Sequence, residues 1–237
     1  MSILTGHFLD IRTQIERALP AQPCLLCGAA SHDGAWCAPC DAALPYLTDP
    51  HCPMCALPTL HGAVCGRCLK RPPQFDHTVA AYAYAFPLDK LIQALKFHEQ
   101  LLLARQLADK LAQRVTIRPD LIIAMPLHPA RLRERGFNQS LELARHIARL
   151  LDIPVKGHAC QRVRDTPPQS TLPWKERGKN MRQAFTCTAN LAGLHVAIVD
   201  DVMTSGASLN EVAQALRRAG AREVSAWVVA RTLPHTG

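Results

Sequence analysis

Eight of the ten cysteines in this 237-residue chain lie in two runs with the same spacing, C-x2-C-x9-C-x2-C. The first run begins at residue 24 and the second at residue 52, so the pattern is an internal repeat. Cysteine thiolates at this spacing can grip a metal ion in pairs, and two pairs close a tetrahedral site of the kind that structural zinc prefers. The candidate ligands are Cys24, Cys27, Cys37 and Cys40 in the first run, and Cys52, Cys55, Cys65 and Cys68 in the second.

Grouping the cysteines run by run is the simplest arrangement, but the spacing also allows the two runs to interleave. An iron–sulfur cluster is a weaker competitor for the same thiolates, and the repeated spacing disfavours a set of unligated thiols. Because all four ligands of each set are cysteine, no coordination position is left for water. We therefore expect two zinc ions with a structural role.

A second chemical signal is the segment IVDDVMTSGASLNE at residues 198–211. Its apolar start predicts a buried strand that delivers Asp200 and Asp201 to its C-terminal end, where open α/β sheets bind ligands. The following Thr-Ser-Gly-Ala-Ser turns into a predicted helix, so backbone N–H groups and hydroxyls converge on a point that suits a phosphate monoester. Carboxylates beside such a point can accept hydrogen bonds from hydroxyl groups of a ligand, or can bind them through a divalent metal ion. The segment therefore predicts a cradle for a ribose 5-phosphate.

A plainer interpretation explains part of the same segment. Ser208 and Glu211 have the spacing of a helix capping box, and the two aspartates could simply end a strand. This interpretation leaves the Thr-Ser-Gly turn after the paired carboxylates unexplained.

Basic residues gather in the segment MPLHPARLRERGFNQS at residues 125–140 and again at residues 162–182. Arg131, Arg133 and Arg135 could neutralise a pyrophosphate, and the second stretch is predicted to be a mobile lid over the site. Residues 131–182 contain twelve Lys or Arg and five Asp or Glu. This surplus of seven positive charges is nearly the whole formal charge of +8. Such a surplus favours a polyanion such as single-stranded DNA, although it is also typical of a solvated face.

The elements that must position these residues follow a linker at residues 71–78. Apolar runs and helical spacing alternate from there on, which predicts a parallel sheet with helices on both faces. We expect two domains, an N-terminal helix with a double zinc ribbon at 1–70 and an α/β domain at 71–237. The predicted strands are 78–86, 121–127, 195–203 and 222–231, and the predicted helices are 89–114 (broken near Glu99), 138–151 and 208–220.

The distribution of apolar and charged residues argues against a membrane-spanning protein and against a secreted one. Apolar runs are much shorter than the roughly 20 residues of a membrane helix. The first twenty residues contain Asp10, Arg12 and Glu16 and predict a short amphipathic helix instead of a signal peptide. We therefore expect a cytoplasmic protein without a membrane span, with its thiols reduced.

Together these segments resemble the ComF family of competence-associated proteins, from the cysteine ribbons through LIQALKFHEQ, PLHPARLRERGFNQS and TPPQSTLPWKERGKNMRQAF to VDDVMTSGAS. The last segment is similar to the loop of type I phosphoribosyltransferases that binds 5-phosphoribosyl 1-pyrophosphate (PRPP). The resemblance implies a type I phosphoribosyltransferase-like fold. It also implies that Asp200 and Asp201 contact the ribose hydroxyls. The residues implied to hold the 5′-phosphate are Thr204, Ser205, Gly206, Ala207 and Ser208.

Three functions stay open. The first is a PRPP-binding protein that acts on, or with, single-stranded DNA during DNA uptake, with the uptake machinery as a further partner. The second is a small-molecule phosphoribosyltransferase of nucleotide salvage, and the third is a non-catalytic nucleic-acid-binding module. In the enzymatic versions Mg²⁺ accompanies PRPP, and Lys96, Arg131 and Arg135 stabilise the departing pyrophosphate.

Overall fold

The computed structural model describes residues 22–234 except 33, 49, 98–100 and 165–183. The predicted N-terminal helix and most of the predicted lid lie outside these residues. Backbone contacts divide the chain into two compact units, Met1–Leu44 and Pro45–Gly237. The first cysteine run lies in the first unit, whereas the second run lies in the second unit. The predicted boundary between domains at residues 70 and 71 stays a prediction.

The first unit is small. Strand β1 (Gln22–Pro23) pairs antiparallel with β2 (Ala30–Ser31), and a short helix, α2 (Ala38–Ala42), follows. The indole of Trp36 is buried, and its Nε1–H donates a hydrogen bond of 2.8 Å to Asp41 Oδ1. A cluster of this size buries too little apolar surface to fold by itself, which is why a metal staple is expected here.

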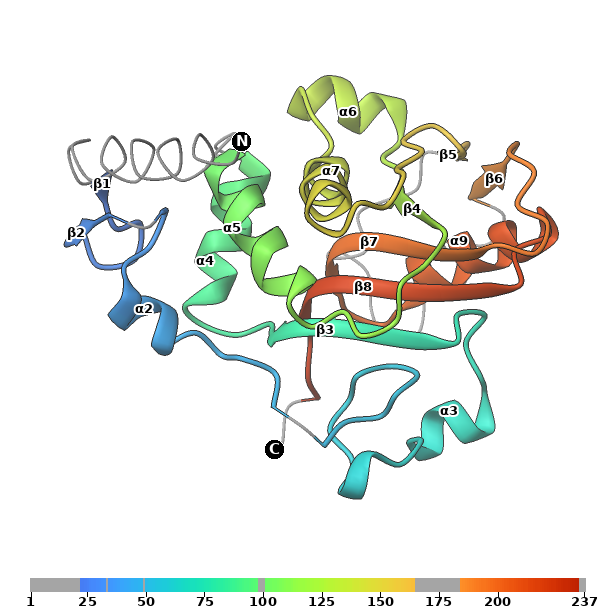
Figure 1. Cartoon of the computed structure of the whole chain (residues 1–237), viewed down its shortest axis with the longest axis horizontal. Coiled ribbons are helices and arrows are strands. Elements are labelled where there is room, and N and C mark those ends of the chain that lie inside the picture. The colour runs from blue at the N-terminus through green and yellow to red at the C-terminus, as the bar shows by residue number, and fades with distance from the viewer. Residues whose placement is uncertain (1–21, 33, 49, 98–100, 165–183, 235–237) are drawn as a thin grey trace, which may run out of the picture. The chain divides into compact units, whose positions relative to one another are not determined.

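A four-stranded parallel sheet forms the centre of the second unit (Figure 1). Its strands, in spatial order, are β3 (His77–Ala83), β8 (Glu223–Arg231), β7 (His195–Met203) and β4 (Leu121–Ala124). β4 and most of β7 and β8 are buried on both faces, as their continuous apolar sequences predicted. The predicted fold class, an α/β parallel sheet flanked by helices, is confirmed.

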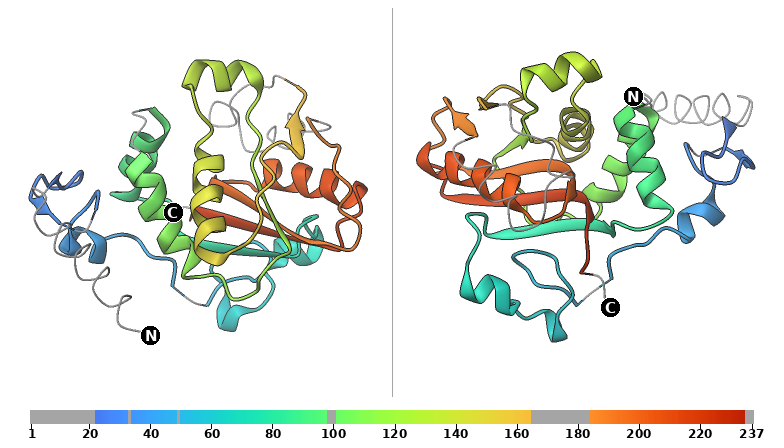
Figure 2. Two further views of the ribbon diagram at one scale, coloured as in Figure 1. Left: turned by 45° about the horizontal axis from the view of Figure 1, so that its top comes forward. Right: turned by 180° about the vertical axis from the view of Figure 1, so that it is seen from behind.

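Helices cover both faces of this sheet (Figure 2). α5 (Leu101–Ala112) and α7 (Gln139–Leu151) pack together over one face, and α9 (Ala207–Arg218) packs on the other. Helix α4 (Leu88–Phe97) precedes α5, and the predicted break near Glu99 falls on residues 98–100, which lie outside the described residues. The core beneath α9 alternates along the strands and includes Val196, Ile198, Val224, Ala226, Val228, Leu209, Val212 and Leu216.

Within residues 71–237, helix α6 and the strand pair β5–β6 were not predicted. The basic segment after β4 forms helix α6 (Pro129–Arg135), with His128 as its N-cap and Gly136 in the left-handed conformation at its C-cap. Proline in the first turn is compatible with a helix, because its missing N–H would be unpaired there in any case. A small antiparallel pair, β5 (Cys160–Arg162) with β6 (Phe185–Cys187), places Cys160 directly opposite Cys187.

The second cysteine run packs beneath β3 within the second unit. It includes a short 3-10 turn, η1 (Leu60–Gly62), and helix α3 (Gly66–Lys70). The N–H of Thr78 in β3 donates to Pro53 O at 2.9 Å, and the Thr78 hydroxyl donates to Met54 O at 2.6 Å. Of the helices that the structure describes, none combines the length and apolar character needed to cross a membrane.

Candidate functional site

The sulfur atoms of the two cysteine runs gather run by run and do not interleave. In each set of four, the sulfurs lie within 4.8 Å of one another. The two sets also share one hydrogen-bond pattern: the N–H of Cys37 donates to Cys24 Sγ at 3.4 Å, and the N–H of Cys65 donates to Cys52 Sγ at 3.3 Å. Such N–H donors favour the thiolate form that binds metal. Four converging thiolates with no oxygen or nitrogen ligand suit a closed, structural zinc site.

The surroundings of the two clusters differ. In the first cluster only Cys24 is buried, and Cys27 is exposed. In the second cluster Cys52, Cys55 and Cys68 are all buried. The second cluster therefore lies in the packed interior of its unit.

Asp200 and Asp201 lie near the C-terminal end of β7, which ends at Met203. Both residues are buried, Asp200 at 8% and Asp201 at 5% exposed. The Ser140 hydroxyl at the start of α7 donates to Asp200 Oδ1 at 3.0 Å. Lys96 of α4 places its Nζ 2.8 Å from Asp201 Oδ2. Segments far apart in the sequence therefore converge on this acid pair.

The two carboxyl groups have opposite electrostatic environments. Burial, and next the neighbouring Asp201, raise the pKa of Asp200 to about 7. Burial also disfavours charge on Asp201, but the Lys96 ammonium outweighs it and holds the pKa of Asp201 below its usual range. In the same way Asp201 outweighs the effect of burial on Lys96 and raises the pKa of that ammonium. Near neutral pH the site thus contains a fixed ion pair and one carboxyl group that titrates.

The predicted phosphate loop lies between β7 and α9. Gly206 is the N-cap of α9 and adopts a left-handed φ of 80°. A residue with a side chain would be strained at this φ, so the turn favours glycine. The Ser205 hydroxyl accepts a hydrogen bond of 3.3 Å from the N–H of Ala207.

The capping-box interpretation of Ser208 is wrong, because Ser208 lies inside α9 and Gly206 occupies the cap. Gly206 has no side chain with which to cap this helix terminus, although Ser205 Oγ accepts from the N–H of Ala207. The first N–H groups of α9 therefore point toward the loop without a side-chain oxygen from the N-cap, which is the arrangement that favours an anion.

Arg231, at the end of β8, forms hydrogen bonds with the backbone at the start of this loop. Its side chain is fully buried, and its guanidinium donates to Cys55 O at 2.7 Å, to Met203 O at 2.9 Å and also to Thr204 O. Burial lowers the pKa of Arg231 to about 10, so it stays charged at neutral pH. One side chain thus joins the backbone of the second cysteine cluster to the backbone of the phosphate loop.

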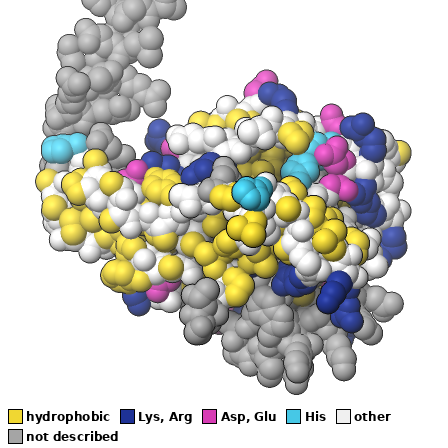
Figure 3. Space-filling view, turned by 90° about the horizontal axis from the view of Figure 1, so that it is seen from below, with side chains coloured by type: hydrophobic (Ala, Val, Ile, Leu, Met, Phe, Trp, Pro, Cys, Tyr) yellow, Lys and Arg dark blue, Asp and Glu magenta, His cyan; other side chains and the backbone are white. Residues whose placement is uncertain are grey.

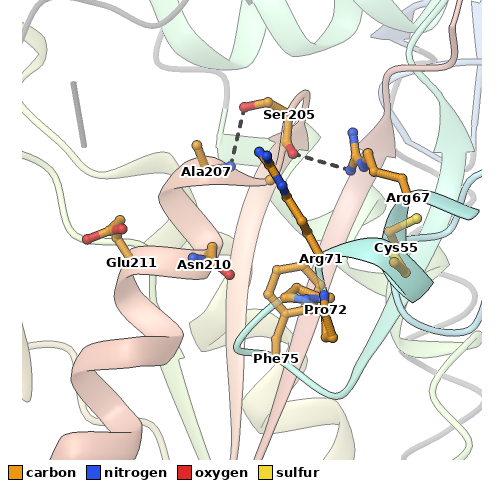
Figure 4. Close-up of a pocket in the computed structure, with 12 residues that line it drawn as sticks. Cys55, Arg67, Arg71, Pro72, Phe75, Ser205, Ala207, Asn210 and Glu211 are labelled. Carbon is orange, nitrogen blue, oxygen red and sulfur yellow. Dashed lines mark hydrogen bonds between the residues drawn. The ribbon is translucent and has the colours of Figure 1, made fainter. Parts of the chain in front are cut away.

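A cavity of about 650 Å³ opens beside the loop (Figure 4). Ser205, Gly206 and Ala207 line one side, and Arg67 and Arg71, from α3 and the residue after it, line the other. Arg67 donates from Nη2 to Ser205 O at 3.4 Å. Sequence reasoning missed these two arginines, although the basic run GRCLKR around Cys68 could have indicated them.

Helix α6 carries the three arginines that were predicted to bind pyrophosphate. Arg135 Nη1 donates to Gln139 Oε1 at 3.3 Å, and Gln139 Nε2 lies 3.4 Å from Asp201 Oδ2. Arg135 is therefore connected to the acid pair through one side chain. Arg133 is exposed and Arg131 is half-buried.

Comparison with known families and proteins agrees with this geometry. A model of the phosphoribosyl transferase domain matches residues 138–235, and a model of the double zinc ribbon domain matches residues 15–69. The chain is 38% identical over 222 residues to the "DNA utilization protein YhgH" of Salmonella typhimurium, which covers 89% of this chain and 97% of that protein. It is 37% identical to the "Competence protein F" of Haemophilus influenzae, covering 77% of this chain and 85% of that protein.

Proposed function

Because this chain belongs to the ComF family, with Competence protein F and DNA utilization protein YhgH, we propose that it binds PRPP and acts on single-stranded DNA. The observation that supports PRPP most directly is the end of β7. A buried carboxylate pair there is followed at once by a glycine turn into the N-terminus of α9. A ribose 5-phosphate likewise carries hydroxyls and a phosphate on one small molecule.

In this proposal each part of the ligand has its own partner. Residues 204–208 hold the 5′-phosphate through backbone N–H groups and hydroxyls. Asp200 and Asp201 accept hydrogen bonds from the ribose hydroxyls. Mg²⁺, when bound together with PRPP, supplies positive charge to the pyrophosphate and ribose oxygens, and carboxylate oxygens such as those of Asp200 suit it.

Transfer from PRPP breaks the bond between the ribose C1 and the pyrophosphate oxygen and forms a bond from C1 to a nucleophile. The electron pair of the broken bond leaves with pyrophosphate, so cations near the leaving group lower the barrier. We assign this role to Arg131 and Arg135 of α6. Lys96 is paired with Asp201, so its contribution is to neutralise the acid pair next to the developing charge on the ribose.

The DNA part of the proposal depends on charge and on the family. Arg131, Arg133 and Arg135 lie on the short helix α6, close in sequence to the Asn138 cap of α7. Such cation clusters bind phosphate backbones by displacing condensed counterions, so the affinity falls as the salt concentration rises. The names of the family's members, which refer to DNA utilization and competence, favour DNA over a small-molecule acceptor.

Calorimetric titration of the zinc-loaded protein with PRPP and Mg²⁺, repeated with a short single-stranded DNA present, tests both parts. We expect PRPP to bind and DNA to change its affinity, because the two ligands share the arginines of α6. Asp200→Asn with Asp201→Asn should abolish PRPP binding, whereas Asp109→Asn on α5 serves as the matched control. Unchanged PRPP affinity in the double variant would overturn the proposed site.

The same titration separates the alternatives. PRPP binding without any effect of DNA would favour a small-molecule phosphoribosyltransferase, and a screen of bases for pyrophosphate release would then follow. DNA binding without PRPP binding would favour a non-catalytic module. Replacing Arg131, Arg133 and Arg135 by alanine should also reduce the salt dependence of DNA binding.

A further inference from the structure

The edge of the sheet opposite the phosphate loop contains a third group of converging metal-ligand side chains. Within the described residues, His77, His195 and Glu223 place one nitrogen or oxygen atom each within 4.8 Å of one another. They lie at the first residues of β3, β7 and β8. Neither the PRPP site nor the cysteine clusters use them.

The register of the sheet explains why these three side chains meet. His195 is directly opposite Glu223, and His77 is directly opposite Ser225. Glu223 and Ser225 are two residues apart on β8 and therefore point to the same face. Paired residues of neighbouring parallel strands also share a face, so all four side chains lie together on one side of the sheet.

The distances and the exposure fit a site that a small ion can reach. Glu223 Oε1 lies 3.7 Å from His77 Nδ1 and 3.9 Å from His195 Nε2. The side chain of His195 is 4% exposed, and those of His77 and Glu223 are 20% and 33% exposed. Histidine side chains also lie beside acidic ones on the face of the molecule that Figure 3 shows. The set thus has a buried floor and an accessible side.

We propose that His77, His195 and Glu223 bind a divalent transition-metal ion such as Zn²⁺, separately from the two cysteine clusters. Two imidazoles and one carboxylate are a ligand set that zinc uses when one position stays open to water or another ligand. Small movements of the side chains would bring the three atoms to tetrahedral separations around one ion. The ion would then join three neighbouring strands.

Contacts around the three ligands support this assignment. His77 Nε2 lies 2.9 Å from Ser225 Oγ, so with Nδ1 on the metal the other ring nitrogen keeps a hydrogen-bond partner, as ligating histidines usually do. Asp120 fixes the backbone of His195 from both sides: its Oδ2 accepts from the His195 N–H at 2.8 Å, and its N–H donates to His195 O at 2.9 Å. Ser225 Oγ also contacts His195 Nε2, and metal binding replaces that contact.

Cobalt titration of the full-length protein, with zinc already bound to both cysteine clusters, tests the site. Co²⁺ bound by imidazole and carboxylate absorbs visible light without the intense thiolate charge-transfer bands of a cysteine site, so exchange at the cysteine clusters is recognised separately. We expect one further equivalent of Co²⁺ to bind. His77→Gln and Glu223→Gln should each weaken Co²⁺ binding by at least roughly tenfold. That is the loss expected from removing an outer-shell partner, and removing a ligand should cost at least as much.

His146→Gln on α7 is the matched control and should bind Co²⁺ as the unmodified protein does. Both test positions are partly exposed, so the variants are expected to fold, and their PRPP titration should be unchanged. The proposal is overturned if no Co²⁺ binds beyond the cysteine clusters, since the three side chains then form only a hydrogen-bonded cluster with Ser225. It is equally overturned if both variants bind Co²⁺ with unchanged affinity.

Discussion

The two cysteine clusters have the same spacing and the same N–H to sulfur pattern, but their surroundings differ. The first lies in a small unit of its own, with Cys27 exposed. The second is buried in the unit that contains the sheet, and the carbonyl of Cys55 accepts a hydrogen bond from Arg231. The repeat therefore encodes two identical metal-binding motifs, whereas the residues around each motif decide what the metal stabilises.

This difference bears on the PRPP site. Arg231 contacts the second cluster and the phosphate loop at once, and Arg67 reaches from α3 to Ser205. Within the second unit, the zinc ribbon thus supports the floor and one wall of the proposed phosphate pocket.

Removing one zinc at a time should produce the largest difference between the two clusters. Cys55→Ser with Cys68→Ser should release the second zinc, lower the Tm of the protein and weaken PRPP binding by roughly tenfold to a hundredfold, because the loop loses its support. Cys27→Ser with Cys40→Ser should release the first zinc and leave PRPP affinity unchanged. Metal analysis, thermal unfolding and calorimetry measure the three effects. Equal losses of PRPP affinity in the two pairs would show that the clusters are equivalent.

Arg231→Met isolates the connection between the second cluster and the loop. Methionine keeps the apolar bulk but removes the donors to Cys55 O and Met203 O, so buried carbonyls lose their charged partner. We expect the free energy of unfolding to fall by about 3 kcal/mol and PRPP affinity to fall while both zinc ions stay bound. Denaturant unfolding and calorimetry measure this, with the exposed Arg218→Met on α9 as the control. Normal PRPP affinity in Arg231→Met would mean that the loop is held by its own sequence.

Much of this organisation could be predicted from the sequence, and the rest could not for identifiable reasons. The predicted strand 195–203 is confirmed residue for residue, since a continuous apolar run bounded by polar turns leaves little choice. The start of α9 was misplaced because Ser208 is a common cap, whereas a glycine cap with positive φ has a weaker sequence signal.

Contacts between distant segments were beyond sequence reasoning. The pairing of Lys96 with Asp201 joins α4 to β7, and no spacing along the chain encodes it. The sequence marks Arg231 only as the end of a strand, because arginine is rarely fully buried and its role depends on carbonyls from two distant segments. The different surroundings of the two clusters were hidden for the same reason, since their spacings are identical.

The smallest effect we predict is a pH dependence of PRPP affinity. It reports on the acid pair alone and not on the support that the second cluster gives to the loop. The raised pKa of Asp200 means that this carboxyl is mostly protonated at about pH 6 and mostly charged at about pH 8. Charge on Asp200 favours Mg²⁺ and the ribose hydroxyls, so PRPP affinity should rise by about tenfold across this range. The phosphates of PRPP also titrate near pH 6, so Asp200→Asn is needed to isolate the contribution of the protein.

The corresponding change in stability has the opposite sign. A carboxyl whose folded pKa is raised contributes stability that is fully present below its unfolded pKa of about 4 and is lost as the pH rises through about 7. Asp200→Asn should remove this loss of stability at higher pH. It should also reduce the pH dependence of PRPP binding to the part that comes from titration of the PRPP phosphates. Arg231→Met, in contrast, should lower PRPP affinity by the same factor at each pH, because it moves the loop and leaves the acid pair intact. Calorimetry at several pH values distinguishes the two, and a variant at Asp200 that keeps the full pH response would place the titrating group elsewhere.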